Sequence, residues 1–195
     1  MTRFETARER RPRGAFTLVE IMIAITLSAF LIAAVMGTTL YLVRNGIRLS
    51  QHAETDAEIR RSIEALANDV RRASALTWNG NTSITLTLPD ASGGSTALSY
   101  AWDSATGTFY AVAGTNPGAP TGRIVLLRHS PTRADGSPGV RFSRLDKEGA
   151  PATTDAGTKR IQISITTWRR SSSALLPVGS TGSATFILRN KATSP

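Results

Sequence analysis

The pattern of apolar and polar positions divides the chain, after its first fifteen residues, into three stretches. In the first of these, from Phe16 to Val43, apolar residues dominate, and residues 21–43 carry no charge. As a helix, residues 21–43 would extend roughly 35 Å at about 1.5 Å per residue, enough to cross a hydrocarbon core of about 30 Å. We therefore expect residues 16–43 to form a membrane-spanning helix.

The second stretch, residues 44–76, is polar but keeps a helical period. Four apolar residues recur at spacings of four, three and four, which places them on one face of a helix: Ile59, Ile63, Leu66 and Val70. Neither Pro nor Gly occurs between Ile47 and Thr77. The pattern predicts a single helix from about Phe16 to Ala75, whose outer, amphipathic half packs this apolar stripe against a sheet.

The third stretch, residues 77–195, changes to a period of two after Trp78-Asn79-Gly80-Asn81, which is typical of a turn. Segments rich in Pro, Gly and Ser separate the candidate strands. The strands are predicted around Ile84–Leu88, Leu98–Trp102, Thr108–Val112, Arg123–His129, Val140–Leu145, Ile161–Ile165 and Ala184–Arg189. A helix followed by short strands indicates an α+β fold, in which an antiparallel β head domain packs on the helix.

Charge then orients the predicted membrane helix. Five of the first fifteen residues are arginines, whereas only Arg44 and Arg48 follow the apolar stretch closely. The positive-inside rule therefore places the N-terminus in the cytoplasm and the head outside the membrane. The chain has a net charge of +9 and no cysteine, so packing alone, without disulfides, must hold the exported head together.

Glu20 is the single charge within residues 16–43, and three interpretations of this stretch treat it differently. A cleaved secretory signal could end at Ile32-Ala33-Ala34, but apolar residues continue beyond that point. A plain signal anchor fits the length and orientation and leaves Glu20 without a role. An ionised carboxylate in hydrocarbon costs several kcal/mol, so the third interpretation assigns it a function and a partner.

The residues from Arg13 to Ile21, with the sequence RGAFTLVEI, resemble the prepilin processing motif of type IV pilins and type II secretion pseudopilins. The resemblance implies that a prepilin peptidase removes residues 1–15 as a basic leader and that Phe16 is then N-methylated. Cleavage after Ala15 makes Glu20 the fifth mature residue, as in the family, whereas cleavage after Gly14 makes it the sixth. The processing residues are thus Gly14, Ala15 and Phe16.

The same resemblance implies how the subunit assembles. Phe16, Thr17 and Glu20 are the expected assembly residues, because Glu20 of one subunit can pair with the new Phe16 amine of its neighbour. Such a buried pair would set the register between subunits more than it adds stability. The implied partners are other pilin or pseudopilin subunits and the assembly platform of the inner (cytoplasmic) membrane.

The segment Asp69-Val70-Arg71-Arg72-Ala73 is similar to the helix end of the J-type minor pseudopilins and W-type minor pilins. The resemblance implies a structural subunit assembled into the filament, with a place at its tip, and not an enzyme. No metal-ligand spacing, nucleophile elbow or phosphate-binding Gly motif occurs, so no cofactor is expected. The alternative is a membrane-anchored binding module for DNA uptake or surface adhesion, for which Lys159-Arg160 and Arg169-Arg170 are the candidate phosphate contacts.

Overall fold

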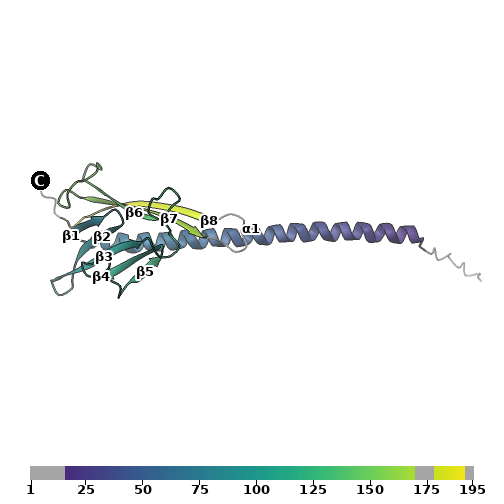
Figure 1. Cartoon of the computed structure of the whole chain (residues 1–195), viewed down its shortest axis with the longest axis horizontal. Helices are drawn as coiled ribbons and strands as arrows, with labels where there is room; N and C mark the ends of the chain where they lie inside the picture. Colours follow the sequence, from purple (N-terminus) through teal and green to yellow (C-terminus); the bar gives the residue numbers. More distant parts are fainter. Residues whose placement is uncertain (1–15, 170–177, 192–195) are drawn as a thin grey trace, which may run out of the picture. The chain divides into compact units, whose positions relative to one another are not determined.

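The computed structural model describes residues 16–169 and 178–191 and contains one long helix and eight strands. Helix α1 spans Leu18–Arg72. The strands, shown in Figure 1, are β1 (Ala75–Gly80), β2 (Ser83–Pro89), β3 (Ser95–Asp103), β4 (Thr108–Ala113), β5 (Ile124–Leu127), β6 (Val140–Leu145), β7 (Arg160–Arg169) and β8 (Val178–Ile187). The chain divides into two compact units, one up to Asn45 and one from Gly46 onward.

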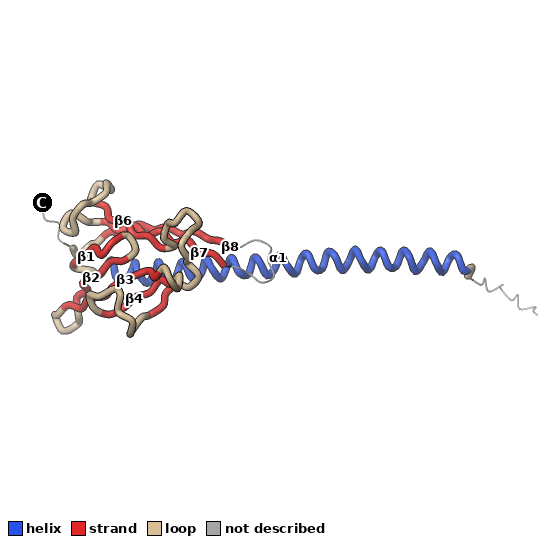
Figure 2. The backbone as a smooth tube through the Cα atoms, in the orientation of Figure 1, coloured by secondary structure: helices blue, strands red, loops and turns tan. Residues whose placement is uncertain are grey.

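The strands form two antiparallel sheets, which confirms the predicted α+β class. One sheet has the order β1-β2-β3-β4-β5 and the other the order β6-β7-β8 (Figure 2). Within each sheet, consecutive strands of the sequence are paired. The backbone joins the two sheets where the N–H of Phe142 in β6 donates to the carbonyl of Asn81, after β1, at 2.7 Å. The head is therefore built from local hairpins and not from a single sheet.

The outer half of α1 supplies one wall of the core. Leu66 and Val70 are fully buried, and Ile59 is nearly so, while Ile63 is half-buried against the same cluster. They pack with inward-facing residues of both sheets, including Ile84, Leu86, Phe109, Phe142, Ile161, Ile163 and Ile165. The helix is held in register with the five-stranded sheet by Ser62, whose hydroxyl donates to the carbonyl of Leu126 at 2.8 Å.

Several element boundaries differ from the sequence-based expectation, among them the end of α1 and the start of β8. The helix ends at Arg72 and not near Ala75, because the N–H of Ser74 already donates to the carbonyl of Thr87 in β2. Strand β1 was missed, because the sequence from Trp78 to Asn81 predicts a turn. In the structure Leu76 and Trp78 alternate with polar residues along a strand, and within β1 only its last residue, Gly80, has a positive φ. Strand β8 begins at Val178, well before Ala184, because pairing with β7 outweighs the weak strand propensity of its Gly and Ser residues.

Gly182 marks the closest approach of β8 to α1. A Cβ atom built at this position would lie 2.6 Å from Cγ2 of Ile59. We expect Gly182→Ala to lower the free energy of unfolding of the head by about 1–3 kcal/mol, the usual cost of overpacking. Combining it with Ile59→Ala should recover part of that loss, whereas Ser183→Ala on the exposed neighbour should cost under about 0.5 kcal/mol. Additive urea-denaturation penalties in the double variant would contradict the contact.

Tyr100 makes the stability of the head dependent on pH. Its side chain is buried beside Phe109, and its hydroxyl donates to Oδ2 of Asp69 on α1 at 2.5 Å. Burial first, and then the hydrogen bond and the charge of Asp69, raise the pKa of Tyr100 above its ordinary value of 10.0. Because the folded-state pKa is the higher one, the stabilisation is complete below pH 10 and is lost as the pH rises past that value.

We therefore expect the free energy of unfolding to fall by about 1.4 kcal/mol for each pH unit above about 10 as a result of this group. Tyr100→Phe should flatten that alkaline limb while costing about 1–3 kcal/mol at neutral pH, because Asp69 loses its partner. Urea denaturation between pH 7 and pH 11 measures both effects. An alkaline limb of equal slope in the variant would show that Tyr100 does not cause it.

Candidate functional site in the N-terminal segment

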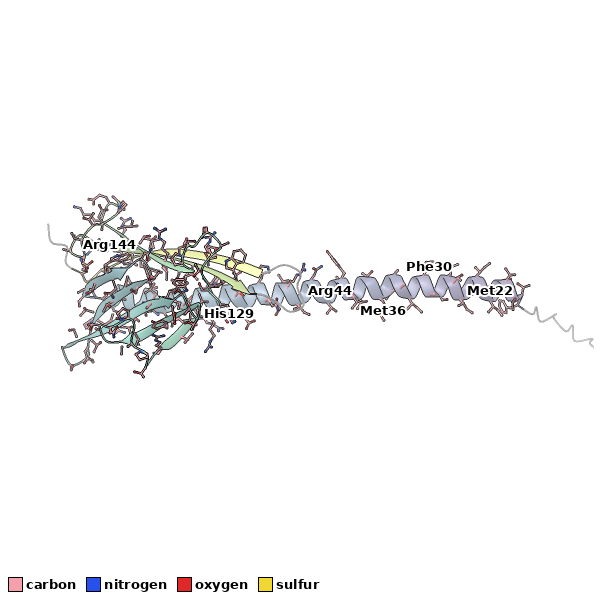
Figure 3. All side chains as sticks on the ribbon, viewed as in Figure 1. Met22, Phe30, Met36, Arg44, His129 and Arg144 are labelled. Carbon is pink, nitrogen blue, oxygen red and sulfur yellow. The ribbon has the colours of Figure 1, made fainter. Side chains whose placement is uncertain are left out.

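The first part of α1 has its apolar side chains exposed on all sides. Every described residue from Phe16 to Arg44 is exposed, and Figure 3 shows Met22, Phe30 and Met36 projecting from the helix. By length and composition, α1 is able to cross a membrane. In its most apolar segment of 18 residues, no residue is buried within the described part of the chain. A helix that is apolar all round requires lipid or other protein around it.

The threonine hydroxyl groups within this apolar segment donate to the helix itself. Thr26 donates to the carbonyl of Ile23 at 2.9 Å, Thr38 to that of Ala34 at 2.9 Å, and Thr39 to that of Val35 at 2.8 Å. Bonding back to the preceding turn leaves none of these three donors unpaired. The segment is thereby suited to a solvent that offers no hydrogen bonds.

Glu20 and Thr17 form a capping box at the start of α1. One carboxylate oxygen of Glu20 accepts the backbone N–H of Thr17 and its hydroxyl, both at 2.9 Å. In return, the backbone N–H of Glu20 donates to Oγ1 of Thr17 at 3.3 Å. This reciprocal arrangement satisfies donors that the first turn of any helix leaves open, and the acid also complements the positive end of the helix dipole.

The carboxylate of Glu20 also lies on a helix face with small residues. Ala24, Ser28 and Ala29 line the same shallow groove along α1 as Glu20, together with larger apolar residues: Phe16, Ile21, Ile25 and Ile32. Small side chains allow another helix to approach closely in a membrane. This face therefore combines one acid, one aromatic residue at the helix start and room for a neighbouring helix.

The predicted site residues divide as follows. Thr17 and Glu20 are bonded to each other, and Phe16 precedes them with 81% of its surface exposed. Gly14 and Ala15 lie outside the described residues, so the cleavage bond stays a prediction, as does pairing of Glu20 with a neighbour's amine. Sequence reasoning missed the capping box, although Thr-x-x-Glu before an apolar run is its signature.

A comparison of the chain with protein families finds a match in this same segment. Residues 10–36 match a family described as the prokaryotic N-terminal methylation motif.

The chain carries a prokaryotic N-terminal methylation motif.

The methylation motif supports the type IV pilin and pseudopilin family, and it covers Phe16, Thr17 and Glu20 together with Gly14 and Ala15. A comparison of the chain with curated proteins finds no match. The motif ends within the apolar segment, before the amphipathic half of α1 and the head. It therefore supports a membrane anchor made for assembly with other pilin subunits and for cleavage by a prepilin peptidase.

The basic pair Lys159-Arg160 is engaged within the head, which makes it less suited to binding DNA than the sequence alone indicates. The ammonium of Lys159 donates to the carbonyl of Lys191, and the Arg160 guanidinium donates to that of Lys147 at 2.8 Å. The side chains of Arg169 and Arg170 lie outside the described residues. Among the residues described, no group of three or more His, Asp or Glu side chains is placed to hold a metal ion.

A cluster of cations instead orders the segment between β6 and β7. Arg144 donates to the carboxylate of Asp155 at 2.9 Å and lies over the ring of Trp78 at 5.2 Å from its centroid. Lys191 is buried, and its ammonium donates to the carbonyl of Ala156 at 2.8 Å. Burial first, and then the charge of Lys159, lower the pKa of Lys191. These contacts fix the segment between β6 and β7 on the head, so the cations of this cluster serve to stabilise the fold.

Proposed function

We propose that the chain is a minor pilin or pseudopilin, a structural subunit that a type IV pilus or a type II secretion pseudopilus incorporates at its tip. The observation that carries the proposal is the methylation motif over residues 10–36, which includes the start of α1, a helix whose most apolar window has no residue buried within the described part of the chain. Its role is structural and not enzymatic. The helix face around Glu20 would contact neighbouring subunits after they leave the membrane.

The domain boundaries follow from this function. Residues 1–15 would be the cleaved leader and residues 16–43 the transmembrane and assembly half of the helix. Its amphipathic half, which carries the stripe from Ile59 to Val70, would begin at residue 44 and end at Arg72. The head would begin with β1 at Ala75, and not at residue 77 as the sequence predicts. The protein would sit in the inner membrane with a single pass, a cytoplasmic N-terminus and a periplasmic head, until it enters the filament. The J-type pseudopilins and W-type pilins remain the subtypes proposed, on the segment from Asp69 to Ala73.

Filament fractionation tests this proposal. An epitope-tagged copy, expressed in cells that assemble pili or pseudopili, should appear in the sheared filament fraction in substoichiometric amounts relative to the shaft subunit. Cross-linking should connect it to other minor subunits. A processed protein that stays wholly in the membrane fraction of cells with abundant filaments would contradict the proposal.

A further inference from the structure

The outer edge of β8 is an unprotected strand edge. Strand β8 pairs with β7 along its whole length without a bulge, and nothing in the described part of the chain pairs with its other side. The hydrogen bonds of β7 show which backbone N–H and C=O groups of β8 point away from β7. Thr166 and Trp168 donate their N–H groups away from β8, to the carbonyls of Gly139 and His129.

Hydrogen-bonding direction alternates along a strand, so the odd-numbered residues of β7 face β8. Their partners in the register, from Thr167↔Ser180 to Ile161↔Phe186, are the even-numbered residues of β8. The N–H and C=O groups of the intervening residues therefore point outward: Gly179, Thr181, Ser183, Thr185 and Ile187. All five of these residues are exposed.

Among the described residues, backbone groups of the other three outermost strands, β1, β5 and β6, are bonded to other parts of the chain. The N–H of Trp78 in β1 donates to the carboxylate of Asp155 at 3.2 Å, and that of Phe142 in β6 donates to the carbonyl of Asn81. Strand β5 is short, and its Leu126 carbonyl accepts the hydroxyl of Ser62. Natural sheets protect exposed edges by such devices, and by Lys or Pro. The ten residues of β8 contain no charge and no Pro.

A groove of about 590 Å³ runs between this edge and the outer half of α1. Ile59, Ile63 and Ala184 give it an apolar floor. Its wall on the helix carries mixed charge, from Asp56, Arg60 and Glu64, and Asp56 accepts the hydroxyl of Ser180 in β8. All the residues that line the groove belong to the unit that begins at Gly46. Strand β8 is the yellow strand of Figure 1. A strand added to β8 would place alternate side chains over Ile63.

We propose that β8 accepts an extended strand from another protein chain, in the manner of β-augmentation. The outward N–H and C=O groups require an extended backbone as their partner. The apolar floor favours β-branched apolar side chains at alternate positions, and the uncharged edge favours a segment without charge.

Residue-resolved hydrogen exchange on the full-length protein in detergent micelles tests the proposal. The probe is a peptide, Lys-Thr-Val-Thr-Val-Thr-Val-Thr-Lys, whose charges lie only at its ends. In the free protein, the amides of Thr181, Ser183 and Thr185 should exchange at least about tenfold faster than those of Gly182 and Ala184. Saturating peptide should slow the first three by about tenfold or more.

A matched pair of variants assigns that protection to the edge. Ser183→Pro removes one outward N–H without breaking a bond to β7, and it should abolish the peptide effect. Ser183→Ala keeps the N–H and should behave as the wild type. A control peptide with Pro at its central position should not protect the edge.

Four results would overturn the proposal. Slow exchange of these amides in dilute free protein would mean that the chain covers its own edge. Protection that grows with protein concentration, without peptide, would identify a second copy as the occupant. Absence of a peptide effect, or an effect unchanged by Ser183→Pro, would show that β8 does not receive the strand.

Discussion

Glu20→Ala is expected to abolish incorporation of the subunit into filaments while leaving membrane insertion and leader removal intact. In the proposed pairing, the substitution would leave the amine of a neighbouring Phe16 buried without a counter-charge, at a cost of about 3–5 kcal/mol. A loss of that size corresponds to a decrease in incorporation on the order of a hundredfold or more. The measurement is the amount of processed protein that copurifies with sheared filaments.

Two further variants separate the charge of Glu20 from its capping role. Glu20→Gln keeps an acceptor for the Thr17 N–H, as capping boxes allow, but removes the charge. Thr17→Val keeps the charge and removes the hydroxyl of the capping box. We expect Glu20→Gln to fail like Glu20→Ala and Thr17→Val to assemble. The reverse result would mean that Glu20 serves the helix start and not the contact between subunits.

Leu66→Ala should lower the free energy of unfolding of the head by about 2–5 kcal/mol. Leu66 is fully buried in the cluster that α1 shares with both sheets, so its removal leaves a cavity in the centre of the core. Since no cysteine reinforces the head, packing at this site carries a large share of its stability. Urea denaturation of a fragment starting at Arg44, followed by tryptophan fluorescence, measures the change.

Arg61→Ala is the matched control, because Arg61 lies on the exposed face of the same helix. It should change the free energy of unfolding by less than about 0.5 kcal/mol. If Leu66→Ala costs no more than Arg61→Ala, the stripe from Ile59 to Val70 does not carry the packing of the helix on the sheets.

The sequence was sufficient for those features that a strong period encodes. Apolar residues at spacings of three and four gave the outer face of α1, and strict alternation gave the centres of β2 and β7. The bounds of β6, Val140–Leu145, also agree with the prediction. The Phe16–Glu20 segment stood out because one acid interrupts a long apolar run. These signals are local, so no tertiary information was needed to detect them.

Features that depend on pairing partners were missed or misplaced. The first half of β8 has Gly and Ser where a strand former is expected, and its strand character comes from β7 beside it. The contact of Gly182 with Ile59 and the bond of Tyr100 to Asp69 join residues distant in sequence, which no period reveals. The division of the strands into two sheets likewise depends on their packing around one helix.

The mass of the mature N-terminus tests the central claim most directly. The full-length chain should be expressed in cells with and without a prepilin peptidase, purified from membranes and analysed by intact and peptide mass spectrometry. The account predicts a chain beginning with N-methylated Phe16 when the peptidase is present and an uncut leader when it is absent. A peptidase-independent start near Val35 would identify an ordinary secretory signal and contradict the assignment of this chain as a pilin-like subunit.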